Sequence, residues 1–397
     1  MKATRLICLI TCGSVLAGSF VAARDFSSSQ ARAFIGSAAP PGHSWYFAVS
    51  GDSRDCGDLI MPKIARSVAA KRAQLPIKFY WHLGDFRALY RIDCDMAKRS
   101  NPSFKCIQGN ASPDETPALR KKYLEAAWPD FIEHEVTAFE QAGVPIYLGI
   151  GNHETIGRTR DEFRLQFKKW LTLPALRGQR KADLKKHIFS KEGDTYFHFV
   201  MKNVDFIYLD NADRNVGFSP EQLNWLAQVL KADADNDSVK TIIVGMHAAL
   251  PHSISSNHAM DETCAGLCSG LQAYDLLDKA QNPDGPQSKR KHVYVLASHS
   301  HFFEEQIYNT PKHKDHVLPG WIVGTAGAEQ YKPEIRYGYM LVEVKPDGTI
   351  ETSFVDVDRN SPPVLSGDWA DKLTNYCFDE NKGSPTSQPA QGCHCIN

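Results

Sequence analysis

Short apolar runs alternate with longer amphipathic stretches along the chain from Ser44 onward. The runs are rich in Val, Ile, Phe and Tyr and predict strands at 45–49, 77–83, 144–150, 196–199, 204–209, 241–244, 293–297 and 320–323. A last pair of runs, 338–344 and 350–357, flanks Pro346-Asp347-Gly348 and predicts a hairpin. The longer stretches predict helices at 62–75, 117–139, 160–170 and 220–231, with Ser219 as the N-cap of the last one. This alternation is typical of an α/β fold built from layers.

The first 23 residues have the pattern of a signal peptide. Lys2 and Arg5 form a basic start, an apolar stretch covers 6–21, and small residues precede Arg24. A membrane anchor is the weaker interpretation, because Gly, Ser and Thr dilute the apolar stretch. Residues 24–43, rich in Ser, Ala, Gly and Pro, predict a linker. We therefore expect a secreted or periplasmic protein.

Removal of the signal peptide takes away Cys8 and Cys12 and leaves eight of the ten cysteines. An even number of cysteines in an exported chain predicts disulfides, but spacing does not select their pairing. Short loops favour Cys94 with Cys106 and Cys264 with Cys268. For the tail we expect Cys377 to pair with one cysteine of Cys393-His394-Cys395, and a metal clamp formed by that triplet is the alternative.

Composition limits the functional classes further. The 397 residues carry 45 Lys and Arg against 46 Asp and Glu, a net charge of −1, which argues against nucleic-acid binding as the main activity. The mature chain has no long apolar run, so we expect no transmembrane span. One domain is predicted at 44–360, with polar insertions at 93–116 and 252–291 arching over one face, followed by a cysteine-containing tail at 361–397.

Metal-ligand residue types follow five of the predicted strands. In chain order these residues are Asp52, Asp85, Asn152, His247 and the pair His299 and His301. Ligands collect at the carboxyl ends of strands in open α/β sheets, so we expect these side chains to meet. A mixed set of oxygen and nitrogen donors suits Zn, Mn, Fe or similar ions.

The motifs Gly51-Asp52, Gly84-Asp85, Gly151-Asn152-His153-Glu154, His247 and His299-Ser300-His301 resemble those of the calcineurin-like metallophosphoesterase superfamily. The resemblance implies two packed mixed sheets flanked by helices and two divalent or mixed-valence metal ions. It implies that Asp85 bridges the ions, that Asp52 and His301 bind the first, and that Asn152, His247 and His299 bind the second. His153 is then a proton donor or phosphate contact, and hydrolysis proceeds by a metal-bridged hydroxide.

This sequence departs from the family pattern at two positions that affect the first ion, and Ser298 replaces the usual Gly before the last pair of histidines. Arg54 stands where the family has its first-motif His, and a guanidinium stays protonated and is no metal ligand. Purple acid phosphatases, which the chain resembles in lacking that His, supply a Tyr where this chain has Ala88. Water or one of three nearby side chains can fill the gap: Tyr90, Asp55 or Asp58.

Further residues are candidates for contacts with the substrate. Arg54 and Arg87 each follow a predicted ligand by two positions and can hold a phosphoryl oxygen, or can pair with a nearby Asp such as Asp55. His252 and His258 follow His247 and are candidates for leaving-group contacts. We expect an exported phosphoesterase for a small-molecule or lipid phosphoester. The alternatives are a one-metal binding module without turnover and a hydrolase of another bond.

Overall fold

The computed structural model describes residues 42–213, 217–255, 258–384 and 388–395. Residues 42–397 form one compact unit. The predicted signal peptide, and all of the predicted linker except residues 42 and 43, lie outside the described residues.

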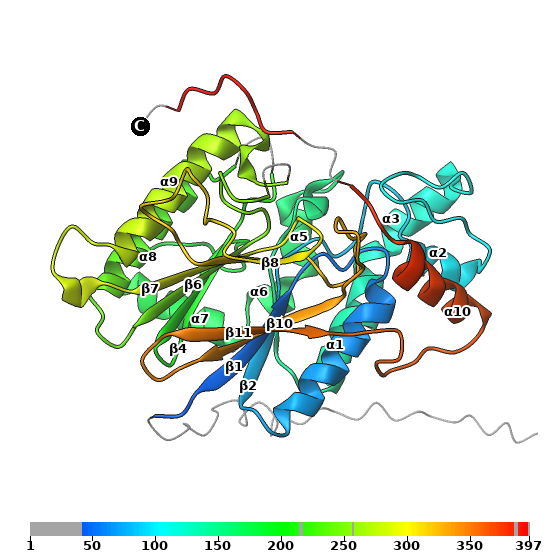
Figure 1. The fold of residues 1–397 in the computed structure, drawn as a ribbon, viewed down its shortest axis with the longest axis horizontal. Coiled ribbons are helices and arrows are strands. Elements are labelled where there is room, and N and C mark those ends of the chain that lie inside the picture. Colours follow the sequence, from blue (N-terminus) through cyan, green and yellow to red (C-terminus); the bar gives the residue numbers. More distant parts are fainter. Residues whose placement is uncertain (1–41, 214–216, 256–257, 385–387, 396–397) are drawn as a thin grey trace, which may run out of the picture. The chain divides into compact units, whose positions relative to one another are not determined.

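Two mixed sheets form the centre of the described unit (Figure 1). The five-stranded sheet has the order β11-β10-β1-β2-β3, in which β1, β2 and β3 are parallel. The six-stranded sheet has the order β4-β5-β6-β7-β9-β8, in which β5, β6, β7 and β9 are parallel. This architecture confirms the predicted α/β fold class. The strands are β1 (Trp45–Ser50), β2 (Ile77–His82), β3 (Ile146–Leu148), β4 (Phe197–Met201), β5 (Val204–Leu209), β6 (Thr241–Met246), β7 (His292–Ala297), β8 (Phe303–Glu305), β9 (Gly320–Val323), β10 (Gly338–Val344) and β11 (Ile350–Asp356).

Aromatic side chains fill the space between the two sheets. Phe206 of β5 makes edge contacts with Phe47 of β1 and Phe79 of β2, with ring centroids 5.2 and 5.1 Å apart. Phe199 of β4 stacks on Phe206 and on Tyr147 of β3. Alternate apolar side chains of these strands thus face the other sheet. Polar residues follow the carboxyl ends of β1, β2, β3, β6 and β7.

Helices pack against both sheets. Helix α1 packs against β2 and β10, and α9 packs against β7 and α8. The α-helices are α1 (Gly57–Arg72), α2 (Cys94–Ser100), α3 (Pro117–Phe131), α4 (Thr137–Gln141), α5 (Arg160–Gln166), α6 (Lys168–Leu171), α7 (Pro174–Leu184), α8 (Pro220–Ala234), α9 (Cys264–Gln281) and α10 (Asp368–Asn375). Short 3-10 helices are η3 (His153–Thr155), η4 (Met260–Glu262) and η5 (Gln287–Lys289), and π-helices are η2 (Ile132–Val136) and η6 (Tyr376–Glu380).

The predicted elements are largely present, with different ends. The strands at 204–209, 320–323 and 338–344 are confirmed, and Ser219 caps α8 by accepting from the Gln222 N–H. The helix predicted at 62–75 begins earlier, at Gly57. The stretch 117–139 is interrupted by the π-helix η2, and 160–170 breaks at Phe167. The interpretation of 252–291 as a polar insertion is incomplete, because Cys264–Gln281 within it form the helix α9.

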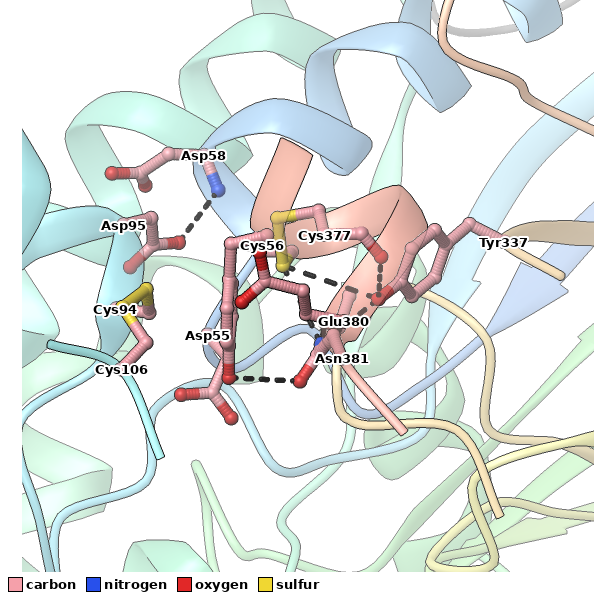
Figure 2. Close-up of a disulfide and its surroundings, with 12 residues drawn as sticks. Asp55, Cys56, Asp58, Cys94, Asp95, Cys106, Tyr337, Cys377, Glu380 and Asn381 are labelled. Atoms are coloured by element: carbon pink, nitrogen blue, oxygen red, sulfur yellow. Dashed lines mark hydrogen bonds between the residues drawn. A yellow bond between two sulfur atoms is a disulfide. The ribbon is translucent and has the colours of Figure 1, made fainter. Parts of the chain in front are cut away.

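Four disulfides are present among the described residues: Cys56–Cys377, Cys94–Cys106, Cys264–Cys393 and Cys268–Cys395. The predicted Cys94–Cys106 pair is confirmed. The pair Cys264–Cys268 is wrong, because both residues lie on α9 and each bonds the tail. The pairing of Cys377 with the tail is also wrong, because it bonds Cys56, beside Tyr337 and Asn381 (Figure 2). Among the described residues, no helix is long and apolar enough to cross a membrane.

Candidate metal centre

The loops that follow β1, β2 and β7 carry three of the predicted ligands in an unusual backbone conformation. Asp52, Asp85 and His299 have φ angles of 60°, 60° and 62°. This left-handed region is disfavoured for residues with a side chain, and such residues are concentrated at functional sites. The loops also bond one another, since Asp52 N–H donates to the Gly84 carbonyl at 3.0 Å. A sharp turn at each strand end therefore directs these side chains into one place.

The carboxylate of Glu154 joins the loops after β2 and β3. Its two oxygens accept backbone N–H bonds from Asp85, Phe86 and Gly151 at 2.9, 2.9 and 2.8 Å. Its side chain is fully buried. The backbone of His153 in turn donates to Asp85 Oδ1 at 2.9 Å. Glu154 was part of the sequence motif but not a predicted site residue, and its function here is to fix the positions of Asp85 and Asn152.

Asp85, Asn152, His247 and His299 lie close together. Ligand atoms of Asp85, His247 and His299 all lie within 4.8 Å of one another. Nε2 of His247 lies 3.2 Å from Asp85 Oδ1 and 2.8 Å from Asn152 Oδ1. All four side chains are buried. Four residues from separate strand ends thus converge on one point.

The hydrogen bonds of His247 define which of its nitrogens faces this point. Its Nδ1 lies 3.1 Å from the Leu83 carbonyl oxygen, so Nδ1 donates its proton there and Nε2 faces Asp85 and Asn152. When Nε2 carries no proton, three acceptor atoms face one another. Either a proton on Nε2 or a cation satisfies this arrangement.

The charged groups around Asp85 also favour a proton or a cation at this point. Burial by itself would raise the pKa of Asp85, but His153 and His247 hold it well below its usual range. Burial likewise opposes the charged form of His247, yet the Asp85 carboxylate raises the pKa of His247 to about 9. Oδ2 of Asp85 is buried and has no hydrogen-bond partner among the described residues. This donor set fits a divalent cation such as Zn, Mn or Fe.

His153 lies at the edge of this group. Its Nδ1 bonds the Ala88 carbonyl oxygen at 2.5 Å, and its Nε2 lies 3.5 Å from Asp85 Oδ2. The ring is 5.2 Å from that of Tyr90. Burial lowers the pKa of His153 to about 3, so the ring is neutral at neutral pH. The proton sits on Nδ1, and Nε2 carries a lone pair.

Asp52 and His301 also lie together, but with an arginine beside them. Asp52 Oδ1 is 3.4 Å from His301 Nε2, and Asp52 Oδ2 accepts the His299 N–H at 2.8 Å. Nδ1 of His301 donates to the Glu329 carbonyl oxygen at 2.7 Å, which leaves the lone pair on Nε2. Nη2 of Arg54 lies 2.9 Å from that Nε2. The residues expected to hold a first ion therefore lie beside a permanent cation, and its charge opposes a metal ion there.

The 252–291 segment brings two further residues to the centre. The ring of His258, a predicted contact residue, stacks on that of His299 with centroids 4.4 Å apart. Glu262 was not predicted: its Oε1 lies 3.6 Å from His299 Nε2 and 3.5 Å from His258 Nδ1. No motif marks Glu262, because it lies in η4, far along the chain from every strand end.

Two predicted substrate contacts, Arg87 and His252, contact other residues of the protein and not the candidate ligands. The Arg87 guanidinium is fully buried in ion pairs with Asp58, Asp95, Asp130 and Glu135. His252 bonds Asp261 through its backbone N–H and lies with its ring 5.9 Å from that of His313. Of the residues considered for the gap left by Ala88, Asp55 is paired with Arg91 and Asp58 with Arg87, while the Tyr90 hydroxyl lies 3.4 Å from Arg54 Nη1.

No family model and no curated protein sequence matches this chain. Among solved structures, it is similar to a dimetal phosphatase from Danio rerio, with 12% identity over 79% of this chain and 98% of that one and a TM-score of 0.46. It is also similar to GAP50, the anchor in the inner membrane complex of Plasmodium, with 15% identity over 79% and 84% of the two chains and a TM-score of 0.44. Purple acid phosphatase PPD1 from yellow lupin has 14% identity over 82% of this chain and 56% of that one, with a TM-score of 0.45. At such similarity no activity is carried over, so the function has to be argued from the residues themselves.

Proposed function

We propose that the chain is an exported metal-dependent phosphoesterase that hydrolyses phosphate mono- or diesters. The observation that supports this most is the convergence of Asp85 Oδ1 and Asn152 Oδ1 on His247 Nε2, at 3.2 and 2.8 Å. A proton on Nε2 or a cation stabilises this buried group. His153 lies beside Asp85, and Arg54 lies beside His301, so groups that can handle protons and anions are close to these residues.

The proposed roles follow from the chemistry of each side chain. Asp85, Asn152, His247 and His299 would hold the ion, which supplies Lewis-acid chemistry toward the phosphoryl group when bound. The amide of Asn152 is neutral and leaves that ion more electrophilic than a further carboxylate would. Arg54 can donate to a phosphoryl oxygen, since a guanidinium binds phosphate through directed N–H groups.

His153 is the proposed source of the proton for the leaving oxygen. In the free protein its Nε2 is unprotonated, because burial lowers the pKa of the ring to about 3. The negative charge of a bound phosphoester favours protonation of a nearby imidazole. His153 would thus take up its proton together with the substrate, and it would then release that proton to the departing alkoxide.

The proposed substrates are small-molecule or lipid phosphoesters. His258 and Glu262, both from the segment 252–291, lie directly beside His299. Loops at strand ends commonly determine specificity. We therefore propose that this segment selects the leaving group.

Export is proposed from the pattern of residues 1–23 and from the four disulfides, since disulfides persist in oxidising compartments. When the full chain is produced with its own leader, amino-terminal sequencing of the exported protein is expected to begin at Arg24. Retention of Met1 in a cell-associated product contradicts this part of the proposal.

The activity is tested on the exported protein after chelation, with Zn²⁺, Mn²⁺ or Fe²⁺ added back. p-Nitrophenyl phosphate and its bis-ester distinguish mono- from diesterase activity. Turnover is expected to depend on the added metal and to fall by at least about 10³-fold in Asp85→Asn, because that change removes a charged ligand. Asp161→Asn, an exposed carboxylate of α5, is the matched control and is expected to leave turnover unchanged.

The alternative is a binding module without turnover. The contact between Arg54 and His301 favours it, because that contact reduces the metal-binding capacity of the site. A chain that retains metal and binds inorganic phosphate, yet hydrolyses neither ester with any metal, supports this alternative and contradicts the phosphoesterase proposal.

A further inference from the structure

The two halves of the centre differ in what lies beside each imidazole. Nε2 of His247 faces the oxygens of Asp85 and Asn152, which are acceptors. Beside His301 lies the guanidinium of Arg54, whose Nη2 is 2.9 Å from Nε2 and 3.5 Å from Nδ1 of the ring. A positive charge therefore already lies against the ring that a first ion would have to bind.

The contacts of Arg54 show that its guanidinium is held in this position. Nη2 lies 3.6 Å from Glu329 Oε1, and Nη1 lies 3.4 Å from the Tyr90 hydroxyl. Only 3% of the residue is exposed. Glu329 is itself fixed by Arg91, at 2.8 Å. The guanidinium is therefore confined on several sides and has little room to leave His301.

The charge of Arg54 is permanent, because a guanidinium is not deprotonated in proteins. It is buried next to the Glu329 carboxylate. A divalent ion at His301 would have to share a buried space with this charge. Like charges at such separation repel strongly where water does not screen them.

We propose that Arg54 takes the place of one of the two cations, so that the centre is mononuclear. One divalent ion is held by Asp85, Asn152, His247 and His299, and the guanidinium supplies the second positive charge beside His301. This inference rests on the proposed phosphoesterase function and specifies how its site is built. Asp52 and His301 then serve as positioning residues: Asp52 fixes the His299 backbone, and His301 fixes Arg54.

A second observation indicates that Arg54 also faces an anion. Its Nε is buried and has no hydrogen-bond partner among the described residues. A buried donor without a partner is costly unless a ligand or water satisfies it. A phosphoryl oxygen has the charge and the acceptor capacity to do so, which makes Arg54 a proposed substrate contact as well as a replacement for a cation.

Metal stoichiometry tests the proposal without relying on activity. The full exported chain is depleted of metal, dialysed against Mn²⁺ and analysed for manganese per chain, and its electron paramagnetic resonance spectrum is recorded. The wild type is expected to bind about one ion with a mononuclear spectrum, and Arg54→His about two with an exchange-coupled spectrum, because dinuclear ions lie close together. Arg54→Lys, which keeps the charge, is expected to remain at about one ion.

Each other outcome is decisive. Two ions in the wild type, or one ion in a folded Arg54→His, overturns the proposal. If Arg54→His does not fold, Asp52→Asn decides: the proposal expects it to keep its ion, and loss of that ion shows that Asp52 is a ligand. One ion without ester hydrolysis contradicts the phosphoesterase function and leaves the mononuclear site standing. Two ions with ester hydrolysis contradict the mononuclear site and leave the phosphoesterase function standing.

Discussion

The carboxylate of Glu154 accepts the backbone N–H of Asp85 at 2.9 Å, although the two residues belong to different strand ends. The same side chain accepts the N–H of Gly151 from its own loop. One buried carboxylate therefore sets the distance between the loops that carry Asp85 and Asn152. Glu154 bonds the backbone of these loops, so we expect it to position the side chains of Asp85 and Asn152.

Replacement of Glu154 by Ala is expected to loosen both loops. Three buried N–H groups would lose their acceptor, at a cost of about 1–3 kcal/mol each before relaxation, so we expect unfolding free energy to fall by about 2–4 kcal/mol. Affinity for Mn²⁺ is expected to fall about tenfold or more, as for other residues that orient ligands. Urea unfolding and equilibrium dialysis measure the two effects. Glu133→Ala, at an exposed position of η2, is the control; a destabilised Glu154→Ala with unchanged Mn²⁺ affinity contradicts the positioning role.

Removal of metal is expected to destabilise the protein. An ion that binds only the folded state adds about 2.7 kcal/mol at a concentration one hundred times its Kd. Calorimetry with Mn²⁺ and after chelation is expected to give a higher melting temperature with metal. His247→Ala is expected to abolish the difference. The control His316→Ala, at an exposed histidine outside the set of candidate ligands, is expected to preserve it. A full metal-dependent shift in His247→Ala means that the ion binds elsewhere.

Stability is expected to decrease above neutral pH because of a buried cluster around His198. Nδ1 lies 2.7 Å from Asp205 and Nε2 lies 2.9 Å from Asp183. Burial opposes the charged ring, but these carboxylates raise the pKa of His198 to about 10. Burial and Asp205 also raise the pKa of Asp233 beside them to about 9, with Lys291 nearby.

The sign follows from the protons bound in each state. Above its ordinary value near 6.5, the unfolded His198 loses its proton while the folded one keeps it up to about pH 10, so this stabilisation is complete below about pH 6.5 and is lost by about pH 10. The slope is up to about 1.4 kcal/mol per pH unit for each proton, and Asp233 adds in the same direction. Urea unfolding from pH 6 to 10 is expected to show a shallower slope in His198→Gln, which is also less stable throughout. The exposed His292→Gln serves as the control, and an equal slope in His198→Gln contradicts the assignment.

The disulfides are expected to contribute unequally. Cys56–Cys377 closes a separation of 321 residues, and Cys94–Cys106 closes one of 12. In the chain-entropy model the longer loop gains more, on the order of 6 against 3 kcal/mol. The double variant Cys56→Ala/Cys377→Ala is expected to melt at a lower temperature than Cys94→Ala/Cys106→Ala. The reverse order would show that native contacts, and not chain entropy, determine the difference.

The positions of the candidate ligands could be predicted because strand ends can be recognised in the sequence. Asp52, Asp85, Asn152, His247 and His299 each follow an apolar run, and parallel strands bring their carboxyl ends to the same edge. Each of these residues could be recognised from the sequence around it alone, because the sheets bring distant strand ends together.

Contacts between loops could not be predicted in this way. Arg54 and His301 are 247 positions apart, and only the packing of the two sheets brings them together. Glu262 lies in a segment whose polar composition concealed α9, a helix beginning with Cys, Ala and Gly. The cysteines of α9 illustrate the same limit: Cys264 and Cys268 are close in sequence, but both are bonded to the tail.

The left-handed backbone at Asp52, Asp85 and His299 costs about 1–3 kcal/mol at each residue. Glycine adopts that conformation at the least cost. Glycine at any of these three turns would therefore relax the main chain while removing the side chain, so the fold gives up stability to carry two aspartates and a histidine there.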